Sequence, residues 1–281
     1  MNNYNLNIEF ESINNFVKKQ KYDTALQKAL KIYPFMKNNH IFENTLGVIY
    51  YKKNNFIQSK KHYVNAITLK KDYARALSNL GNQLLDEKNI LMALKFHIKA
   101  IRIEPNNEQF IRNLYYTIIN FEPSAFNEVW NESLIILLSS TNYLDSIDCE
   151  NIKSFSIKHL RLNTEFLKII NKPRKILNSD CLNNLLINLD KFDLFLLCLN
   201  TGTILNLEIE KFLTYLRQQI LINYKYFHNQ NKHNKILEAL AINCFKNDYV
   251  FHESNDETKI LKKIENEISV SWLSKKEITS T

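Results

Sequence analysis

Asn79 and Asn113 stand 34 residues apart in the chain, and their side chains could grip the backbone of a peptide. A side-chain amide has N–H donors and a carbonyl acceptor, which match the C=O and N–H groups of an extended chain. A ladder of such amides would hold a backbone without reading its sequence. Basic residues at Lys52, Arg75 and Arg112 would add attraction for carboxylates. The alternative is compositional drift, because asparagine is common throughout this chain and two could fall in register without any ligand.

Catalytic and metal-binding motifs are absent from the sequence, which has neither a Gly-rich phosphate loop nor an HExxH pair. His228 and His233 are five residues apart, the wrong spacing for one helical face, and no carboxylate cluster joins them. We interpret His252 and Glu253 as a surface pair at a helix end. The four cysteines form no CxxC pair and are expected to be buried, reduced thiols: Cys149, Cys181, Cys198 and Cys244. We therefore predict no catalytic residue, no metal and no cofactor.

An internal repeat supplies the elements that would position the ladder. Gly47 and Gly81 each follow a leucine and are separated by 34 residues, and the same offset joins Ala66 to Ala100. A glycine inside a helix costs about 1 kcal/mol relative to alanine, so its place there indicates close approach of a neighbouring helix. Pro105 lacks an amide donor and ends its helix. This period, with large and small residues alternating on two helices, resembles the tetratricopeptide repeat (TPR).

The repeats are predicted at about 10–39, 40–73 and 74–107, followed by a capping helix near 108–121. The resemblance implies antiparallel helix pairs whose first helices line a concave groove. With the two glycines at the eighth position of the motif, the groove-facing residues are Ile41, Asn44, Thr45, Val48, Tyr51 and Lys52, then Arg75, Ser78, Asn79, Asn82, Leu85 and Asp86, then Gln109, Arg112, Asn113 and Tyr116. The amides and cations among them form the predicted partner-binding site: Asn44, Lys52, Arg75, Asn79, Asn82, Arg112 and Asn113.

Residues 121–268 show no further 34-residue match but keep helical apolar spacing, which predicts a second all-helical domain, with a degenerate extension of the repeat stack as the alternative. The predicted helices span about 130–140, 155–170, 177–188, 192–200, 207–227, 235–251 and 258–268, and residues 269–281 are expected to be a loose tail. Gly202 is expected to end the helix before it. The presence of only 3 Gly and 4 Pro argues against a many-stranded β fold, which needs frequent turns. The predicted fold class is all-α, a TPR-type superhelix followed by a second all-helical domain.

The net charge of +8 is concentrated in the first part of the chain. Residues 1–120 carry 18 Lys and Arg against 9 Asp and Glu, whereas the remainder is close to neutral. This asymmetry favours an acidic partner for the repeats. No signal peptide and no apolar run long enough to cross a bilayer is visible, so a soluble cytoplasmic protein is expected, without membrane contact.

Two stretches resemble bacterial proteins that join N-terminal TPRs to a helical middle region and an S-adenosylmethionine-dependent methyltransferase domain. The stretches are 207–217 (LEIEKFLTYLR) and 239–251 (ALAINCFKNDYVF), in which Asp248 stands where the family has glutamate. The resemblance covers the non-catalytic front of such proteins. None of the three glycines forms the GxGxG turn that would cradle the cofactor, so methyltransferase activity is not carried over.

The predicted function is a protein–protein interaction scaffold, or adaptor, that binds a protein or peptide partner in the concave groove and is not an enzyme. The alternative is a non-catalytic part of a methyltransferase, which recruits substrate for, or regulates, a catalytic domain absent from this chain and supplied in trans. The basic first half also allows non-specific RNA binding, but nucleic acid is not the expected partner.

Overall fold

The computed structural model describes residues 3–172, 174–228, 235–246, 255 and 257–266. Within these ranges the secondary structure is helical, without strands, so the predicted all-α fold is confirmed. The chain divides into two compact units. The first comprises residues 1–123 and 127–146, and the second comprises residues 124–126 and 147–281.

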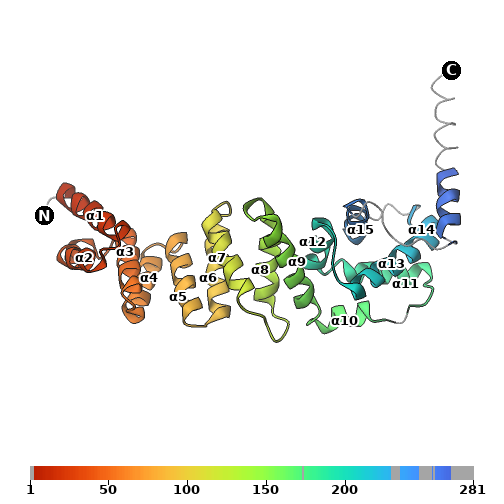
Figure 1. Ribbon diagram of the computed structural model, residues 1–281, viewed down its shortest axis with the longest axis horizontal. Helices are drawn as coiled ribbons and strands as arrows, with labels where there is room; N and C mark the ends of the chain where they lie inside the picture. Colours follow the sequence, from red (N-terminus) through yellow and green to blue (C-terminus); the bar gives the residue numbers. More distant parts are fainter. Residues whose placement is uncertain (1–2, 173, 229–234, 247–254, 256, 267–281) are drawn as a thin grey trace, which may run out of the picture. The chain divides into compact units, whose positions relative to one another are not determined.

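The first unit is a series of helices in which each packs on the next along the chain (Figure 1). Its helices are α1 (Asn3–Lys18), α2 (Tyr22–Met36), α3 (His40–Lys52), α4 (Phe56–Leu69), α5 (Ala74–Asp86), α6 (Ile90–Ile103), α7 (Glu108–Ile119) and α8 (Glu128–Ser139), followed by the short 3-10 turn η1 (Thr141–Tyr143). The first helices of successive pairs also contact one another, α1 with α3, α3 with α5 and α5 with α7. This is the TPR-type arrangement of stacked helix pairs, with α8 packed on both α6 and α7.

The turns between paired helices repeat the 34-residue register in their backbone. Gln20, Asn54 and Lys88 have φ angles of 58°, 58° and 59°. This left-handed conformation is uncommon for residues other than glycine. Its recurrence at one register position shows that all three helix pairs, including the weakly matching first one, share one turn geometry.

The mid-helix glycines Gly47 and Gly81 allow the second and third helix pairs to pack closely. A Cβ atom built on Gly47 would lie 2.5 Å from Cδ1 of Tyr63, and one on Gly81 would lie 2.7 Å from Cε1 of His97. Ser59 reinforces the first contact, because its hydroxyl donates to the Gly47 carbonyl at 2.9 Å. The two rings belong to α4 and α6, so the close helix approach inferred from the glycines is confirmed.

The described part of the second unit is also helical, and its first helix begins at the boundary between the two units. Its helices are α9 (Ser146–Leu160), α10 (Thr164–Ile170), α11 (Ser179–Leu189), α12 (Asp193–Thr201), α13 (Leu207–Ile222), α14 (Tyr224–His228) and α15 (Lys235–Lys246), and residues 257–266 are also helical. The single helix predicted over 155–170 is two, because the Asn163 side chain starts a new helix by accepting from the amides of Glu165 and Phe166. Gly202 follows α12 with φ 133°, which confirms its predicted place at a helix end.

Asparagine has a structural role that drift does not explain. Among the described helices, six begin with an asparagine whose side-chain oxygen accepts a backbone amide of the first turn. The six are Asn39, Asn55, Asn127, Asn163, Asn178 and Asn206. Such a cap satisfies a donor that the helix leaves unpaired and stabilises it by about 1 kcal/mol. No helix in the described part of the chain is long and apolar enough to cross a bilayer.

Candidate peptide-binding groove

A groove of about 360 Å3 lies along the first helices of the second pair, the third pair and the helix that follows them. Four of the seven predicted site residues line it: Lys52 from α3, Asn79 and Asn82 from α5, and Asn113 from α7. They come together because α3, α5 and α7 are neighbours and because residues 34 positions apart recur on the same helical face. We call this surface the repeat groove.

Three predicted residues do not line the repeat groove. Asn44 is 8% exposed and its carbonyl oxygen accepts from Asn79, so it lies under the groove surface. Arg75 is exposed at the start of α5. Arg112 on α7 donates through Nε to Glu108 at 2.8 Å, one turn away on the same helix.

The side-chain amides of Asn79 and Asn113 link neighbouring helices to one another. Asn79 Nδ2 donates to Asn44 Oδ1 at 3.0 Å, and Asn113 Nδ2 donates to Ser78 Oγ at 2.9 Å. Each bond spans 35 residues and links the first helix of one pair to the first helix of the next. Each contributes about 1 kcal/mol to holding the pairs in register. The 34-residue spacing of these amides therefore has a structural cause that does not require a ligand.

Some amide groups in the repeat groove remain available. Asn82 makes no side-chain hydrogen bond to any described residue, and its side chain is half-buried on the groove wall. Asn113 accepts from Gln109 at 3.0 Å and donates to Ser78, which leaves one of its two N–H groups uncommitted within the described chain. Asn79 similarly uses one N–H, while its carbonyl accepts nothing from the described residues. The groove thus offers both donors and acceptors to an extended backbone.

Aromatic residues line the repeat groove beside the amides. Tyr51 donates its hydroxyl to Asp86, Tyr63 forms part of the wall, and Tyr116 is 54% exposed. Burial and the hydrogen bond to Asp86 both raise the pKa of Tyr51, so its hydroxyl stays protonated. The repeat register places Tyr51, Asp86 and Tyr116 at groove-facing positions. The predicted site did not include them, because it was limited to amides and cations. Tyr63 was missed because it belongs to a second helix.

The charge of the repeat groove is mixed. Lys52 is exposed at its edge, with Nζ 5.6 Å from the centroid of the Tyr51 ring. Asp86 lines the same groove and is engaged by Tyr51. Because Arg75 and Arg112 lie outside, Lys52 is the cation of the predicted set that borders this surface.

Outside the repeat groove, the described residues offer little further reactive chemistry. No group of three or more His, Cys, Asp or Glu side chains there could hold a metal ion. Of the four free cysteines, Cys198 alone is fully buried and Cys181 is exposed, so the expectation of burial holds for one thiol. Burial raises the pKa of Cys198 to about 12, which leaves it unreactive. The side chain of His228 and the whole of His233, His252 and Glu253 lie outside the described residues.

No family model and no curated protein matches this chain. The solved structures that are similar to this chain include one chain of the structure of Naa15/Naa10 bound to HypK-THB, with a TM-score of 0.43 and 15% sequence identity. The match covers 94% of this chain and 41% of that chain, so this chain spans about two fifths of its length. The stretches that resemble methyltransferase-linked proteins lie in α13 and α15, with 247–251 outside the described residues, and that resemblance stays a prediction.

Proposed function

We propose that this chain is an interaction scaffold that holds an extended segment of a partner protein in the repeat groove. The observation that carries the proposal is the set of amide groups on α5 and α7, at Asn79, Asn82 and Asn113, which open onto one groove and keep hydrogen-bonding capacity. Peptide C=O and N–H groups need such partners once they leave water, because an unmade bond costs about 1–3 kcal/mol. The aromatic rings of Tyr51 and Tyr116 supply apolar contact area beside them.

The segment is proposed to carry acidic residues. Lys52 borders the repeat groove, and residues 1–120 carry twice as many basic as acidic side chains. A positive field attracts an acidic chain from a distance and speeds its association, an effect that salt screens. Asp86 would set the position of the acidic residues by repelling them from the α5 end of the groove.

The test compares amides that the fold uses with one that it does not. Asn82→Ala removes a groove amide without breaking any described hydrogen bond, whereas Asn79→Ala/Asn113→Ala also breaks two links between helices. Asn184→Ala is the matched control, since Asn184 is exposed in a helix of the second unit. A library of displayed peptides is selected on the full chain, and the recovered peptides are measured against each variant. We expect Asn82→Ala to weaken binding about tenfold, equivalent to about 1.4 kcal/mol.

Three results would decide between interpretations. Equal binding by wild type, Asn82→Ala and the double variant would remove the groove as the site. Loss in the double variant alone, with a lowered unfolding midpoint, would assign these amides to stability instead of binding. Selection of basic rather than acidic peptides would keep the groove and reverse the proposed charge.

The methyltransferase alternative has its own readout. Affinity capture from a lysate of the source cell, followed by mass spectrometry, identifies the natural partner. A methyltransferase-fold protein that wild type retains would make this chain the recruiting or regulatory part of an enzyme supplied in trans. Some other protein, retained by wild type and lost in Asn82→Ala, would support a free adaptor.

A further inference from the structure

The first helices that line the repeat groove run in the same direction and in one register. Asn79 on α5 donates to Asn44 on α3, and the hydroxyl of Tyr51 on α3 donates to Asp86 on α5. The first bond lies near the helix starts and the second near the helix ends, yet both join residues 35 positions apart in the chain. A constant offset of this kind requires parallel helices, so residues at equivalent register positions lie side by side across the groove.

The repeat groove therefore has an amide side and an apolar side. Asn79 and Asn113 stand at equivalent register positions, toward the helix starts. From the next turn onward the lining contains Asn82 together with apolar and aromatic side chains, which are Val48, Tyr51, Leu85 and Tyr116. A chain that crosses the three helices would meet amides along one edge and apolar side chains along the other.

The apolar side rests on the core of the first unit. Val48 and Leu85 are half-buried and pack against a core cluster that includes Tyr63 and Leu80. The ring of Tyr63 also lines the groove and is packed closely over Gly47. Because the fold already holds these side chains in place, a ligand would gain apolar contact there without having to order them.

An extended segment suits a groove with two such sides. Successive side chains of an extended chain point to opposite faces, so every second residue of the segment would face the groove floor. A polar side chain placed over Val48 and Leu85 would lose water without gaining a hydrogen-bond partner from them, whereas a large apolar one would gain contact. The neighbouring residues of the segment would point to solvent and could carry charge.

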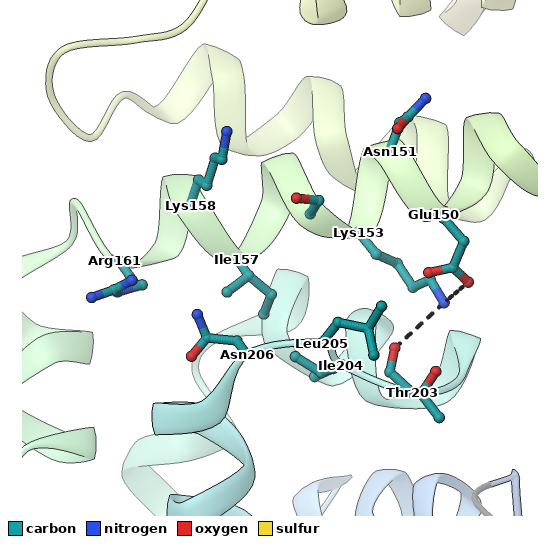
Figure 2. Close-up of a pocket in the computed structure, with 11 residues that line it drawn as sticks. Glu150, Asn151, Lys153, Ile157, Lys158, Arg161, Thr203, Ile204, Leu205 and Asn206 are labelled. Carbon is teal, nitrogen blue, oxygen red and sulfur yellow. Dashed lines mark hydrogen bonds and ion pairs between the residues drawn. The ribbon is translucent and has the colours of Figure 1, made fainter.

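The cleft of the second unit differs from the repeat groove in its charges. It has a volume of about 440 Å3 and lies between α9 and the loop that joins α12 to α13 (Figure 2), and we call it the α9 cleft. Its Lys153 pairs with Glu150, and its Arg161 pairs with Glu208 at 2.9 Å, so the chain itself neutralises these cations. Lys52 of the repeat groove makes no ion pair with any described residue, and it is free to pair with an acidic ligand.

We propose that the repeat groove selects an acidic segment that carries one large apolar residue, whose side chain packs on Val48, Leu85 and Tyr116. The amides of Asn82 and Asn113 hold the backbone of the same segment. This inference rests on the proposed function and adds a sequence preference to it, since acidic composition and an extended backbone alone would not be enough for tight binding.

The test is a double-mutant cycle between ligand and groove. Two labelled synthetic peptides of one length have acidic residues around a central residue, which is leucine in one and serine in the other, and fluorescence anisotropy measures their binding to the full chain. Tyr116→Ser removes an exposed ring, and Val48→Thr replaces an apolar side chain by a polar one of similar shape. Leu205→Ser is the matched control, since Leu205 is an apolar residue of the α9 cleft with 86% exposure.

We expect wild type to bind the leucine peptide about tenfold more tightly than the serine peptide. Tyr116→Ser and Val48→Thr should each reduce this preference to about threefold or less, whereas Leu205→Ser should keep it. Asn82→Ala should weaken both peptides and keep the preference. A variant that is partly unfolded weakens both peptides equally, so the ratio of the two affinities separates lost contact from lost structure.

Equal binding of the two peptides by wild type, with both weakened in Asn82→Ala, would overturn this inference and leave the proposed function standing. A leucine preference that survives both Tyr116→Ser and Val48→Thr, or that Leu205→Ser removes, would place the apolar contact outside the repeat groove and also overturn it. If neither peptide binds, or if every groove variant leaves binding unchanged, the proposed function fails and this inference fails with it.

Discussion

His97 is predicted to make the first unit sensitive to mild acid. Its ring lies against Gly81 and is fully buried, and neither ring nitrogen has a hydrogen-bond partner among the described residues. Burial lowers the pKa of His97 from 6.5 to about 4. The folded state therefore holds the neutral ring, whereas the unfolded chain takes up a proton below about pH 6.5.

The sign and size follow from this difference in pKa. The stability associated with the neutral ring is complete above pH 6.5 and falls as the pH drops toward 4, because the unfolded state binds more protons in that window. The total loss is about 3 kcal/mol, of which about 2 kcal/mol has occurred at pH 5. His97→Phe removes this contribution while retaining a ring against Gly81, so the variant should gain about 2 kcal/mol relative to wild type between pH 7.5 and pH 5.

The assay is urea unfolding of the full chain followed by tryptophan fluorescence. The sequence has two tryptophans, so a Trp272→Phe background leaves Trp130, which is buried in α8 of the first unit, as the reporter. Tyr63→Phe is the matched control, since Tyr63 occupies the same register position against Gly47 and does not titrate below neutral pH. If His97→Phe changes stability by the same amount at pH 7.5 and pH 5, the reasoning from a buried neutral imidazole is refuted.

Three further predictions concern the backbone and helix ends. Gly47→Ala should lower stability by about 1–3 kcal/mol despite the better helix propensity of alanine, because the new methyl group meets the buried Tyr63 ring; a raised urea midpoint would contradict this. Lys88→Gly should raise stability by up to about 1 kcal/mol by relieving the left-handed backbone, and Lys88→Ala, which keeps a Cβ atom, should not; equal effects in denaturant titrations would refute the backbone explanation. Asn163→Ala should cost about 1 kcal/mol and speed amide hydrogen exchange in the first turn of α10, whereas Asn163→Asp should retain most of the cap; unchanged exchange in the alanine variant would count against it.

The repeats were predictable because close helix packing restricts residue type. Gly47 and Gly81 had to be small to admit a ring from the second helix, and that restriction recurs in the sequence at a fixed spacing. The break between α9 and α10 was not predictable from apolar spacing, since the pattern of buried residues continues across it. The division that starts α10 depends on one side chain, Asn163, in a chain where asparagine is too common to mark a boundary by itself.

The candidate site was predictable in position more than in chemistry. Register placed Lys52, Asn79, Asn82 and Asn113 on one face, and the repeat groove holds all four. Sequence alone could not show which amides the fold itself uses, because a bond such as that from Asn79 to Asn44 depends on the stagger between neighbouring helices. The α9 cleft gave no signal in the sequence, since its walls come from segments about 50 residues apart without a repeat to relate them.

The asparagine caps have a consequence for how this fold responds to its surroundings. An aspartate cap owes part of its strength to a negative charge, which acid removes and salt screens. A carboxamide neither gains nor loses a proton between acid and neutral pH, so the six capped helix starts keep their hydrogen bonds across that range and at any ionic strength. Mild acid would therefore destabilise this protein through ionisable groups in its interior, such as His97, while the hydrogen bonds of its asparagine caps persist.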